Sequence, residues 1–263
     1  MLDLKTREKI VDDLFAVYET RTPLALLTKT YPNIEIEDSY RIQEMFVARR
    51  IAAGHTIKGY KVGLTSKPMQ EMMGSSEPDF SAMTDDLFLP ENKPIEAARY
   101  FDPMIEIEIA FVMKTKLKGP GILPADVIAA TDFVLPAIEL VDFRVARAPG
   151  MNLIDTVADL AACGAVMLGA NRRQLDQIDI CRVKGSILCD GKVEQEGEAS
   201  AVLGNPVASV AWLANKLGEF GAAFEPGHII LTGSFVRAVP IKAGDEFICR
   251  FDQGFGEIAT KFI

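Results

Sequence analysis

The sequence is poor in histidine and cysteine, with two and four of these residues in 263. His55 and His228 each follow a glycine in turn-like segments, so a histidine metal cage or a Ser/His triad has little material. The cysteines form no C-x-x-C pair and lie in apolar segments. This usage is typical of buried free thiols in a reducing cytoplasm and argues against a disulfide framework.

The sequence also lacks an excess of basic residues and any long hydrophobic run. Its formal net charge is −9 and its pI is near 4.9, whereas a nucleic-acid binder needs a basic patch for phosphate contacts. No run approaches the roughly 18 apolar residues of a membrane span. The N-terminal residues 1–7 carry scattered charges, which is unlike a signal peptide. A cytoplasmic protein with small-molecule partners is expected.

Apolar residues make up 49% of the chain, which is enough to build a core without disulfides or structural metals. Apolar residues recur at helical spacing in 4–18 and again in 40–51, where Asp38 is the expected N-cap and Gly54 the expected end. From about residue 59 the pattern changes to short apolar runs broken by Gly, Pro and Asp, which is typical of strands. We therefore expect a helical region over 1–58 and a sheet-rich body over 59–263, built as one structural unit.

Two helices are expected among the later strands, one starting near Pro124 and one over 205–221. Asp190-Gly191 and the segment 253–256 are expected to form tight turns between neighbouring strands. Helices do not alternate strictly with strands, which disfavours a doubly wound sheet. The fold class predicted is α+β, with a mixed sheet body and an N-terminal helical layer.

Paired carboxylates are the most informative chemical feature. Glu106 and Glu108 lie in Met104-Ile105-Glu106-Ile107-Glu108-Ile109, where strand alternation places both on one face, roughly 7 Å apart. Glu139 lies in a second apolar run, 133–141. Buried carboxylates need a cation, and oxygen ligands without His or Cys suit Mg²⁺ or Mn²⁺ better than zinc. The alternative is that Glu106 and Glu108 line the wet face of an edge strand while Glu139 caps a strand end.

Several weaker signals accompany the carboxylates. Lys61 lies on a short apolar strand, where it needs a negative partner unless it extends to water. Asp79 lies in a turn-rich loop, and Asp155 and Asp159 are four apart on a possible helix. The apolar strand 229–235 ends in small polar residues, which can offer hydroxyl and N–H groups to a ligand.

In their order and residue sequence these segments resemble those of the hydratase/decarboxylase family of aromatic meta-cleavage pathways. This family is related to the fumarylacetoacetate hydrolase fold. The matching segments are Gly59-Tyr60-Lys61-Val62-Gly63-Leu64-Thr65-Ser66, Glu77-Pro78-Asp79-Phe80, Ile105-Glu106-Ile107-Glu108-Ile109-Ala110-Phe111, Leu135-Pro136-Ala137-Ile138-Glu139, Asp155-Thr156-Val157-Ala158-Asp159 and Leu231-Thr232-Gly233-Ser234-Phe235. The resemblance implies a partly barrel-like sheet body, a homo-oligomer, and possible association with another enzyme of the pathway.

The resemblance also implies a metal-dependent lyase that hydrates a 2-hydroxy-2,4-dienoate. It implies that Glu106, Glu108 and Glu139 bind one Mg²⁺ or Mn²⁺, with Lys61 and Asp79 in the same pocket. Within that picture Lys61 holds the substrate oxygen or shuttles a proton, and Asp79 is a general acid or base. Three further roles are assigned to side chains of the matching segments or just beyond them: Asp159 as counter-ion of Lys61, Thr65 and Ser234 as donors to the substrate carboxylate, and Arg237 as partner of a distal carboxylate.

Two positions depart from the family pattern. Leu160 stands where asparagine is common, and Met104 stands where an arginine often precedes the paired glutamates, so a polar group and a positive charge are missing. Segments around Asp155 and Ser234 favour the hydratase branch, in particular forms acting on 2-oxohept-4-ene-1,7-dioate. The alternatives are 4-oxalocrotonate decarboxylase, which shares a dienolate of a 2-keto acid, and a non-catalytic scaffold of the same fold.

Overall fold

The computed structural model describes residues 1–91 and 93–263 and combines helices with two β-sheets. The α-helices are α1 (Leu4–Thr20), α2 (Leu27–Thr30), α3 (Ile36–Ala52), α4 (Lys67–Met72), α5 (Pro124–Ala130), α6 (Leu153–Ala158) and α7 (Pro206–Glu219). Short 3₁₀ turns lie at Asp85–Leu87, Ala97–Arg99, Leu160–Ala162, Leu175–Gln177, Ile180–Arg182 and Ala199–Ala201. None of the helices in these two ranges has the length and apolarity to cross a membrane.

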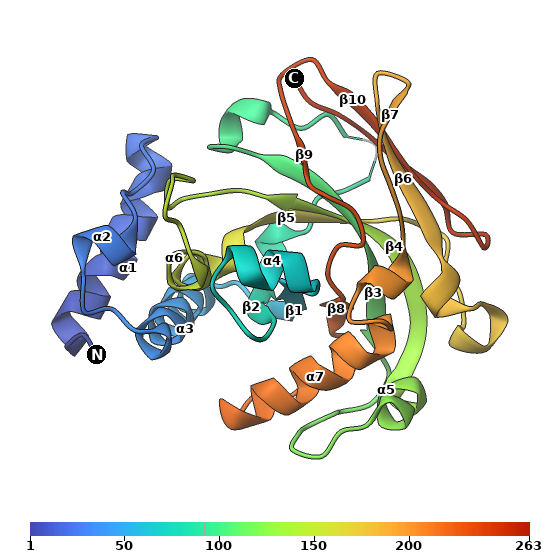
Figure 1. The fold of residues 1–263 in the computed structure, drawn as a ribbon, viewed down its shortest axis with the longest axis horizontal. Helices are drawn as coiled ribbons and strands as arrows, with labels where there is room; N and C mark the ends of the chain where they lie inside the picture. The colour runs from blue at the N-terminus through green and yellow to red at the C-terminus, as the bar shows by residue number, and fades with distance from the viewer. Residues whose placement is uncertain (92) are drawn as a thin grey trace.

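The strands form one larger and one smaller sheet. They are β1 (Ile57–Gly63), β2 (Asp79–Thr84), β3 (Met104–Met113), β4 (Thr131–Val141), β5 (Cys163–Leu168), β6 (Lys184–Cys189), β7 (Lys192–Glu198), β8 (Ile229–Leu231), β9 (Val239–Pro240), β10 (Glu246–Phe251) and β11 (Gly256–Lys261). The larger sheet has the order β2-β1-β8-β3-β4-β5, with β9 paired to β3, and the smaller has the order β11-β10-β6-β7. The mixed α+β class with a partly barrel-like sheet is confirmed, since the larger sheet curls into a half-barrel (Figure 1).

The N-terminal helices gather beside the larger sheet, where α1 packs on α3 and α3 packs on α6 (Figure 1). Their buried residues, such as Ile10 and Phe46, belong to the same apolar core as Val62 on β1. The core is therefore continuous across residue 58, and the division into 1–58 and 59–263 stays a prediction.

Capping at the start of α3 differs from the sequence prediction. The helix begins at Ile36, with Glu35 at the N-cap and Asp38 at the third helical position. The Asp38 carboxylate accepts from the Glu35 N–H at 3.0 Å and from the Leu2 N–H at 3.0 Å. Asp38 as N-cap was therefore wrong, because this carboxylate caps the helix from inside its first turn and also fixes the start of the chain.

The turn at Asp190-Gly191 is confirmed. Both residues have positive φ, 49° and 78°, and they join β6 to β7 in antiparallel pairing. This backbone matches the twist of a two-residue hairpin, which is why Asp-Gly is favoured there. The smaller sheet packs on β3 through β6, where Gly185 approaches Ile107. The isoleucine face of β3 is thereby buried against the second sheet, and the glutamate face turns the other way.

Candidate active site

Three glutamates converge where β3 and β4 pair. The strands run antiparallel with Glu106 directly opposite Glu139, and Glu108 follows on the same face of β3. One carboxylate oxygen from each residue lies within 4.8 Å of those of the other two. The strand alternation and the apolar run around Glu139 therefore produce a single cluster of oxygen ligands.

The carboxylates lie inside the sheet. Strand β3 is paired with β4 on one side and with β8 and β9 on the other, so the alternative of an edge strand is wrong. Glu108 and Glu139 are buried, and Glu106 is half-buried. Burial, reinforced by Glu139, raises the pKa of Glu106 to about 8, and burial with the two neighbouring carboxylates raises the pKa of Glu108 well above its ordinary value.

The donor set fits a hard divalent cation. Glu139 Oε2 is buried without a hydrogen bond and Oε1 has only the Lys61 ammonium as a partner, at 2.9 Å, whereas Glu108 Oε2 accepts the Gly233 N–H at 2.7 Å. Buried oxygens of this kind are costly unless a cation or a donor satisfies them. Three carboxylates without nitrogen or sulfur ligands are the chemistry that Mg²⁺ and Mn²⁺ prefer. The geometry therefore supports metal binding by Glu106, Glu108 and Glu139.

Lys61 is buried on β1 and points at the glutamates. Its Nζ lies 2.9 Å from Glu139 Oε1 and donates to the Ala161 carbonyl oxygen at 2.8 Å. The alternative of a lysine extended to water is wrong. Burial alone would lower the pKa of Lys61, but the negative charges of Glu139 and Asp79 outweigh it and raise the pKa. Lys61 is therefore a charged donor at the carboxylate cluster.

Asp79 faces the same cluster from the first residue of β2. It is opposite Gly63 in the β1–β2 pairing, and its Oδ1 is buried without a hydrogen bond. Burial raises its pKa to about 6, with Lys61 opposing the shift. A Cβ at position 63 would lie 2.1 Å from Asp79 Oδ1, so only glycine leaves room for this carboxyl group. A carboxyl that titrates near neutral pH suits acid and base work.

The two predicted hydroxyl donors differ in their contacts within the protein. Thr65 is buried beside Gly233, where a Cβ would lie 2.6 Å from Thr65 Oγ1, and Gly233 in turn binds Glu108. Ser234 Oγ lies 2.9 Å from the Val236 carbonyl oxygen, to which its hydroxyl donates. Thr65 is therefore next to the cluster, and Ser234 is engaged by the backbone.

Arg237 has an exposed side chain just beyond this segment. Its predicted contact with a distal substrate carboxylate stays a prediction.

Asp159 has a different partner from the one predicted. Its carboxylate pairs with the Arg144 guanidinium and also accepts the backbone N–H groups of Arg144, at 2.7 Å, and Val145, at 3.1 Å. Lys61 is paired with Glu139 instead. The prediction that Asp159 is the counter-ion of Lys61 was therefore wrong, because helix α6 ends at Ala158 and the chain turns Asp159 toward Arg144.

Arg144 is the residue that sequence reasoning missed. It lies three residues beyond β4 and is 2% exposed. The only signal was a charged residue between Phe143 and Val145, and such a residue is more often at the surface.

The two departures from the family pattern lie in different surroundings. Leu160 has a φ of 53°, in the left-handed region that asparagine adopts more readily than leucine. At the start of β3, Arg147 Nη1 lies 3.3 Å from Met104 Sδ, and Arg147 pairs with Asp102 at 2.7 Å. A positive charge therefore does approach this strand, supplied by Arg147 from outside it.

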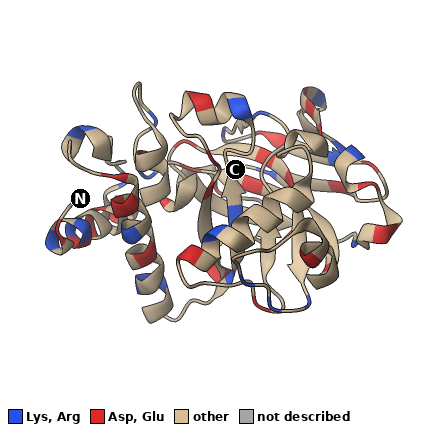
Figure 2. Cartoon of the chain, turned by 60° about the horizontal axis from the view of Figure 1, so that its bottom comes forward, with Lys and Arg blue, Asp and Glu red and all other residues tan. Residues whose placement is uncertain are grey.

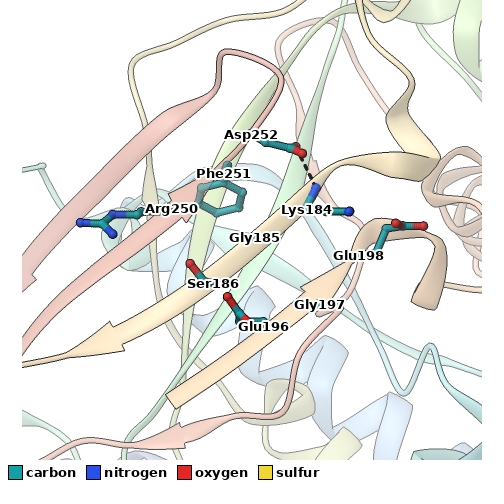
Figure 3. Close-up of a pocket in the computed structure, with 9 residues that line it drawn as sticks. All are labelled: Lys184, Gly185, Ser186, Glu196, Gly197, Glu198, Arg250, Phe251 and Asp252. Carbon is teal, nitrogen blue, oxygen red and sulfur yellow. Dashed lines mark hydrogen bonds between the residues drawn. The ribbon is translucent and has the colours of Figure 1, made fainter. Parts of the chain in front are cut away.

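A separate hollow of about 640 Å³ lies on the smaller sheet, and none of the residues predicted for the site lines it (Figure 3). It is lined by Lys184, Gly185, Ser186, Glu196, Gly197, Glu198, Arg250, Phe251 and Asp252. Figure 2 shows acidic and basic residues intermingled along the described chain. The hollow shares no residue with the carboxylate cluster, so it adds nothing to the chemistry proposed below.

Known proteins resemble the chain over its full length. The protein is 39% identical to 2-oxo-hept-4-ene-1,7-dioate hydratase of Escherichia coli over all of both chains. It is 36% identical to 4-oxalocrotonate decarboxylase of Pseudomonas putida, covering 90% of this chain and 89% of that one. The solved structure of 4-oxalocrotonate decarboxylase from Pseudomonas putida G7, complexed with magnesium and adipate, superimposes with a TM-score of 0.95 at 32% identity, covering 100% and 99% of the two chains.

The similarity thus joins hydratases and decarboxylases, the two branches that the sequence motifs indicated. The profile of the family described as Fumarylacetoacetate (FAA) hydrolase C-terminal matches residues 52–263, which contain the three glutamates, Lys61 and Asp79. The chain belongs to the fumarylacetoacetate hydrolase C-terminal family.

Proposed function

We propose that the protein is a divalent-metal-dependent lyase that adds water to a 2-hydroxy-2,4-dienoate to give a 4-hydroxy-2-oxo acid. The observation that carries the proposal is the convergence of three carboxylates within 4.8 Å beside buried Lys61. Glu106, Glu108 and Glu139 would hold Mg²⁺ or Mn²⁺. The bound cation would supply a Lewis acid for the substrate's 1-carboxylate and 2-oxygen and offset the negative charge that develops there.

Hydration requires two proton movements. Protonation at C5 of the dienol moves the double bond to C3–C4 and leaves a 2-ketone, and water then adds at C4 while C3 gains a proton. Lys61 would hold the 2-oxygen, and the contacts of its ammonium with Glu139 and the Ala161 carbonyl support this role. Asp79, with a pKa of about 6 and an oxygen free of hydrogen bonds, is suited to deliver or accept the proton.

The names of the relatives and the positive charge of Arg237 support a substrate class. A relative named for a dioate, and a structural neighbour complexed with adipate, support a dicarboxylate substrate. Thr65 lies beside the cluster and would bind the 1-carboxylate, with Ser234 as a second donor if its hydroxyl leaves the Val236 carbonyl. Arg237 would meet the distal carboxylate. We also propose a homo-oligomer and association with another enzyme of the same pathway, as the resemblance implies.

The second candidate is 4-oxalocrotonate decarboxylation. It is favoured by the close superposition on a decarboxylase and needs the same cluster, because both reactions stabilise negative charge at the 2-oxygen. The presence of all three glutamates together with Lys61 and Asp79 disfavours a non-catalytic scaffold. Turnover on any dienoate would reject the scaffold.

A panel of mono- and dicarboxylic dienols separates the candidates. With Mg²⁺, hydration removes the ultraviolet absorbance of the dienol without release of CO₂, whereas decarboxylation releases CO₂ from 4-oxalocrotonate. Glu106→Gln is the loss-of-site control. CO₂ release from 4-oxalocrotonate without any loss of dienol absorbance would favour the decarboxylase over the hydratase. No reaction in either assay would reject catalysis.

A further inference from the structure

The turn at Leu160–Ala162, which we call the 160–162 turn, has an unusual backbone. Its three residues Leu160, Ala161 and Ala162 all have positive φ, at 53°, 48° and 58°. Residues with a Cβ rarely adopt this region, and three in succession persist only where the surroundings impose it. The structure must therefore contain groups that hold this turn in place.

Arg144 binds the turn at both ends. Its Nη2 donates to the carbonyl oxygens of Asp159 and Cys163, each at 2.9 Å, and its Nη1 also donates to Cys163 at 2.9 Å. Its Nε pairs with the Asp159 carboxylate. A planar guanidinium has five donors in a fixed fork, which suits it to bridging two carbonyls and a carboxylate at once. The buried ion pair thus closes the turn across its base.

The centre of the turn reaches the active site. The Ala161 carbonyl oxygen accepts the hydrogen bond from Lys61 Nζ at 2.8 Å, and the same ammonium is 2.9 Å from Glu139 Oε1. Without the carbonyl, Glu139 would be the one remaining polar partner of the Lys61 ammonium among the described residues, and the direction of the ammonium would be less restricted. The Ala161 carbonyl is therefore one of the two polar contacts that hold the Lys61 ammonium.

We propose that Arg144 is a positioning residue for Lys61, acting through the 160–162 turn. This inference rests on the proposed function, in which Lys61 holds the substrate oxygen. Arg144 contacts none of the three glutamates, so its loss should reduce the rate of the chemical step and leave metal and substrate binding in place.

The test compares steady-state dienol turnover and Mn²⁺ binding in four proteins at a temperature well below their unfolding. Arg144→Lys keeps the charge beside Asp159 but cannot span all three acceptors. Arg144→Met with Asp159→Leu removes both buried charges together, which avoids leaving one unpaired. Arg50→Met is the matched control, since Arg50 is also nearly buried, pairs with Asp86 and contacts Tyr18 like Arg144, but does not bind the turn. Wild-type protein is the reference.

Both Arg144 variants should lower kcat by about 10- to 100-fold, the cost of misplacing a catalytic group by about an ångström. KM should stay within about twofold of the wild-type value, and so should the Kd for Mn²⁺, measured by electron paramagnetic resonance. The reason is that Arg144 contacts neither the glutamates nor the residues proposed to bind the substrate carboxylates. Arg50→Met should keep kcat. Amide exchange at 160–163 should rise in the Arg144 variants only.

A folded Arg144→Lys protein with unchanged kcat would overturn the proposal, as would an equal loss in Arg50→Met or a parallel loss of Mn²⁺ affinity. If the double variant does not fold, Arg144→Lys decides the question. Wild-type protein without turnover on any dienoate or on 4-oxalocrotonate would overturn the proposed function itself, and with it this inference; normal wild-type turnover with insensitive Arg144 variants would overturn the inference alone.

Discussion

Two buried charged clusters lie side by side in this protein, and they are built on opposite principles. Arg144 and Asp159 form a balanced pair in which both oxygens of the carboxylate accept hydrogen bonds. In the neighbouring cluster Lys61 is the one cation beside Asp79 and three glutamates, and it leaves one oxygen of Glu139 and one of Asp79 without a partner. A balanced pair fixes structure, whereas an unbalanced cluster needs either a bound cation or retained protons to offset its excess negative charge.

The largest effect should come from removing one carboxylate of the unbalanced cluster. Glu106→Gln should reduce metal-dependent turnover by at least about 100-fold, because a neutral amide is a weaker ligand and offsets less cation charge. Turnover and Mn²⁺ titration measure it. Glu196→Gln in the hollow of Figure 3 is the control and should retain full activity. Equal activity of the two variants would remove Glu106 from the site.

Breaking the balanced pair should affect stability instead. Asp159→Leu alone leaves Arg144 buried without its counter-ion and should cost about 3–5 kcal/mol of unfolding free energy. Adding Arg144→Met should recover much of that loss. Urea denaturation of the single and double variants provides the measurement, and a double variant no more stable than the single one would show that the pair is not the cause.

The room left for Asp79 can be tested by filling it. Gly63→Ala adds a methyl group whose carbon would lie 2.1 Å from Asp79 Oδ1, so the carboxyl group must move. We expect kcat to fall about tenfold or more, with the free energy of unfolding changed less than in Asp159→Leu. Kinetics and denaturation of the same preparation give both values. A variant with wild-type kcat would mean that the position of Asp79 is not critical.

The unbalanced cluster should also make the metal-free protein sensitive to pH. Glu106 has a folded-state pKa of about 8 against an ordinary value of 4.5, so between these values the folded chain retains a proton that the unfolded chain has released. Stability of the metal-free protein should therefore fall as pH rises from about 4.5 to about 8, and Mn²⁺ affinity should rise because binding needs the ionised carboxylates. Thermal unfolding in EDTA across this range, repeated for Glu106→Gln, checks the sign. A flat profile for wild type would contradict it.

The smallest effect is expected at an exposed pair of the smaller sheet. Arg250 lies 3.4 Å from Glu257, with both side chains more than half exposed, so solvent screens the attraction. Arg250→Ala should change unfolding free energy by less than about 1 kcal/mol and leave turnover unchanged. A large loss of activity would show that the hollow on this sheet takes part in the reaction.

The sequence predicted the parts of the site that depend on strand periodicity. Alternation along 104–109 placed Glu106 and Glu108 on one face, and the apolar run around Glu139 indicated a second buried strand. The resemblance then joined Lys61 and Asp79 to them. Glu106, Glu108 and Glu139 project from paired strands, so the local pattern was enough to give their direction. It was not enough for Asp79, which was expected in a loop and is the first residue of β2.

The rest depended on contacts that no local pattern contains. Asp159 was paired with the wrong cation because the end of α6 and the 160–162 turn decide its direction, and neither has a periodicity. Arg144 gave almost no signal, since a buried arginine is recognised only by the acceptors that surround it. Arg147, which brings a charge to Met104, lies 43 residues away in sequence.

The measurement that tests the central claim most directly is the titration of the metal-free protein with Mn²⁺ in an isothermal titration calorimeter. We predict one bound ion per chain in wild type, and binding lost or weakened at least about 100-fold in Glu139→Gln, while Asp159→Asn still binds one ion. Equal binding by wild type and Glu139→Gln would contradict the claim that the unbalanced cluster is a metal site.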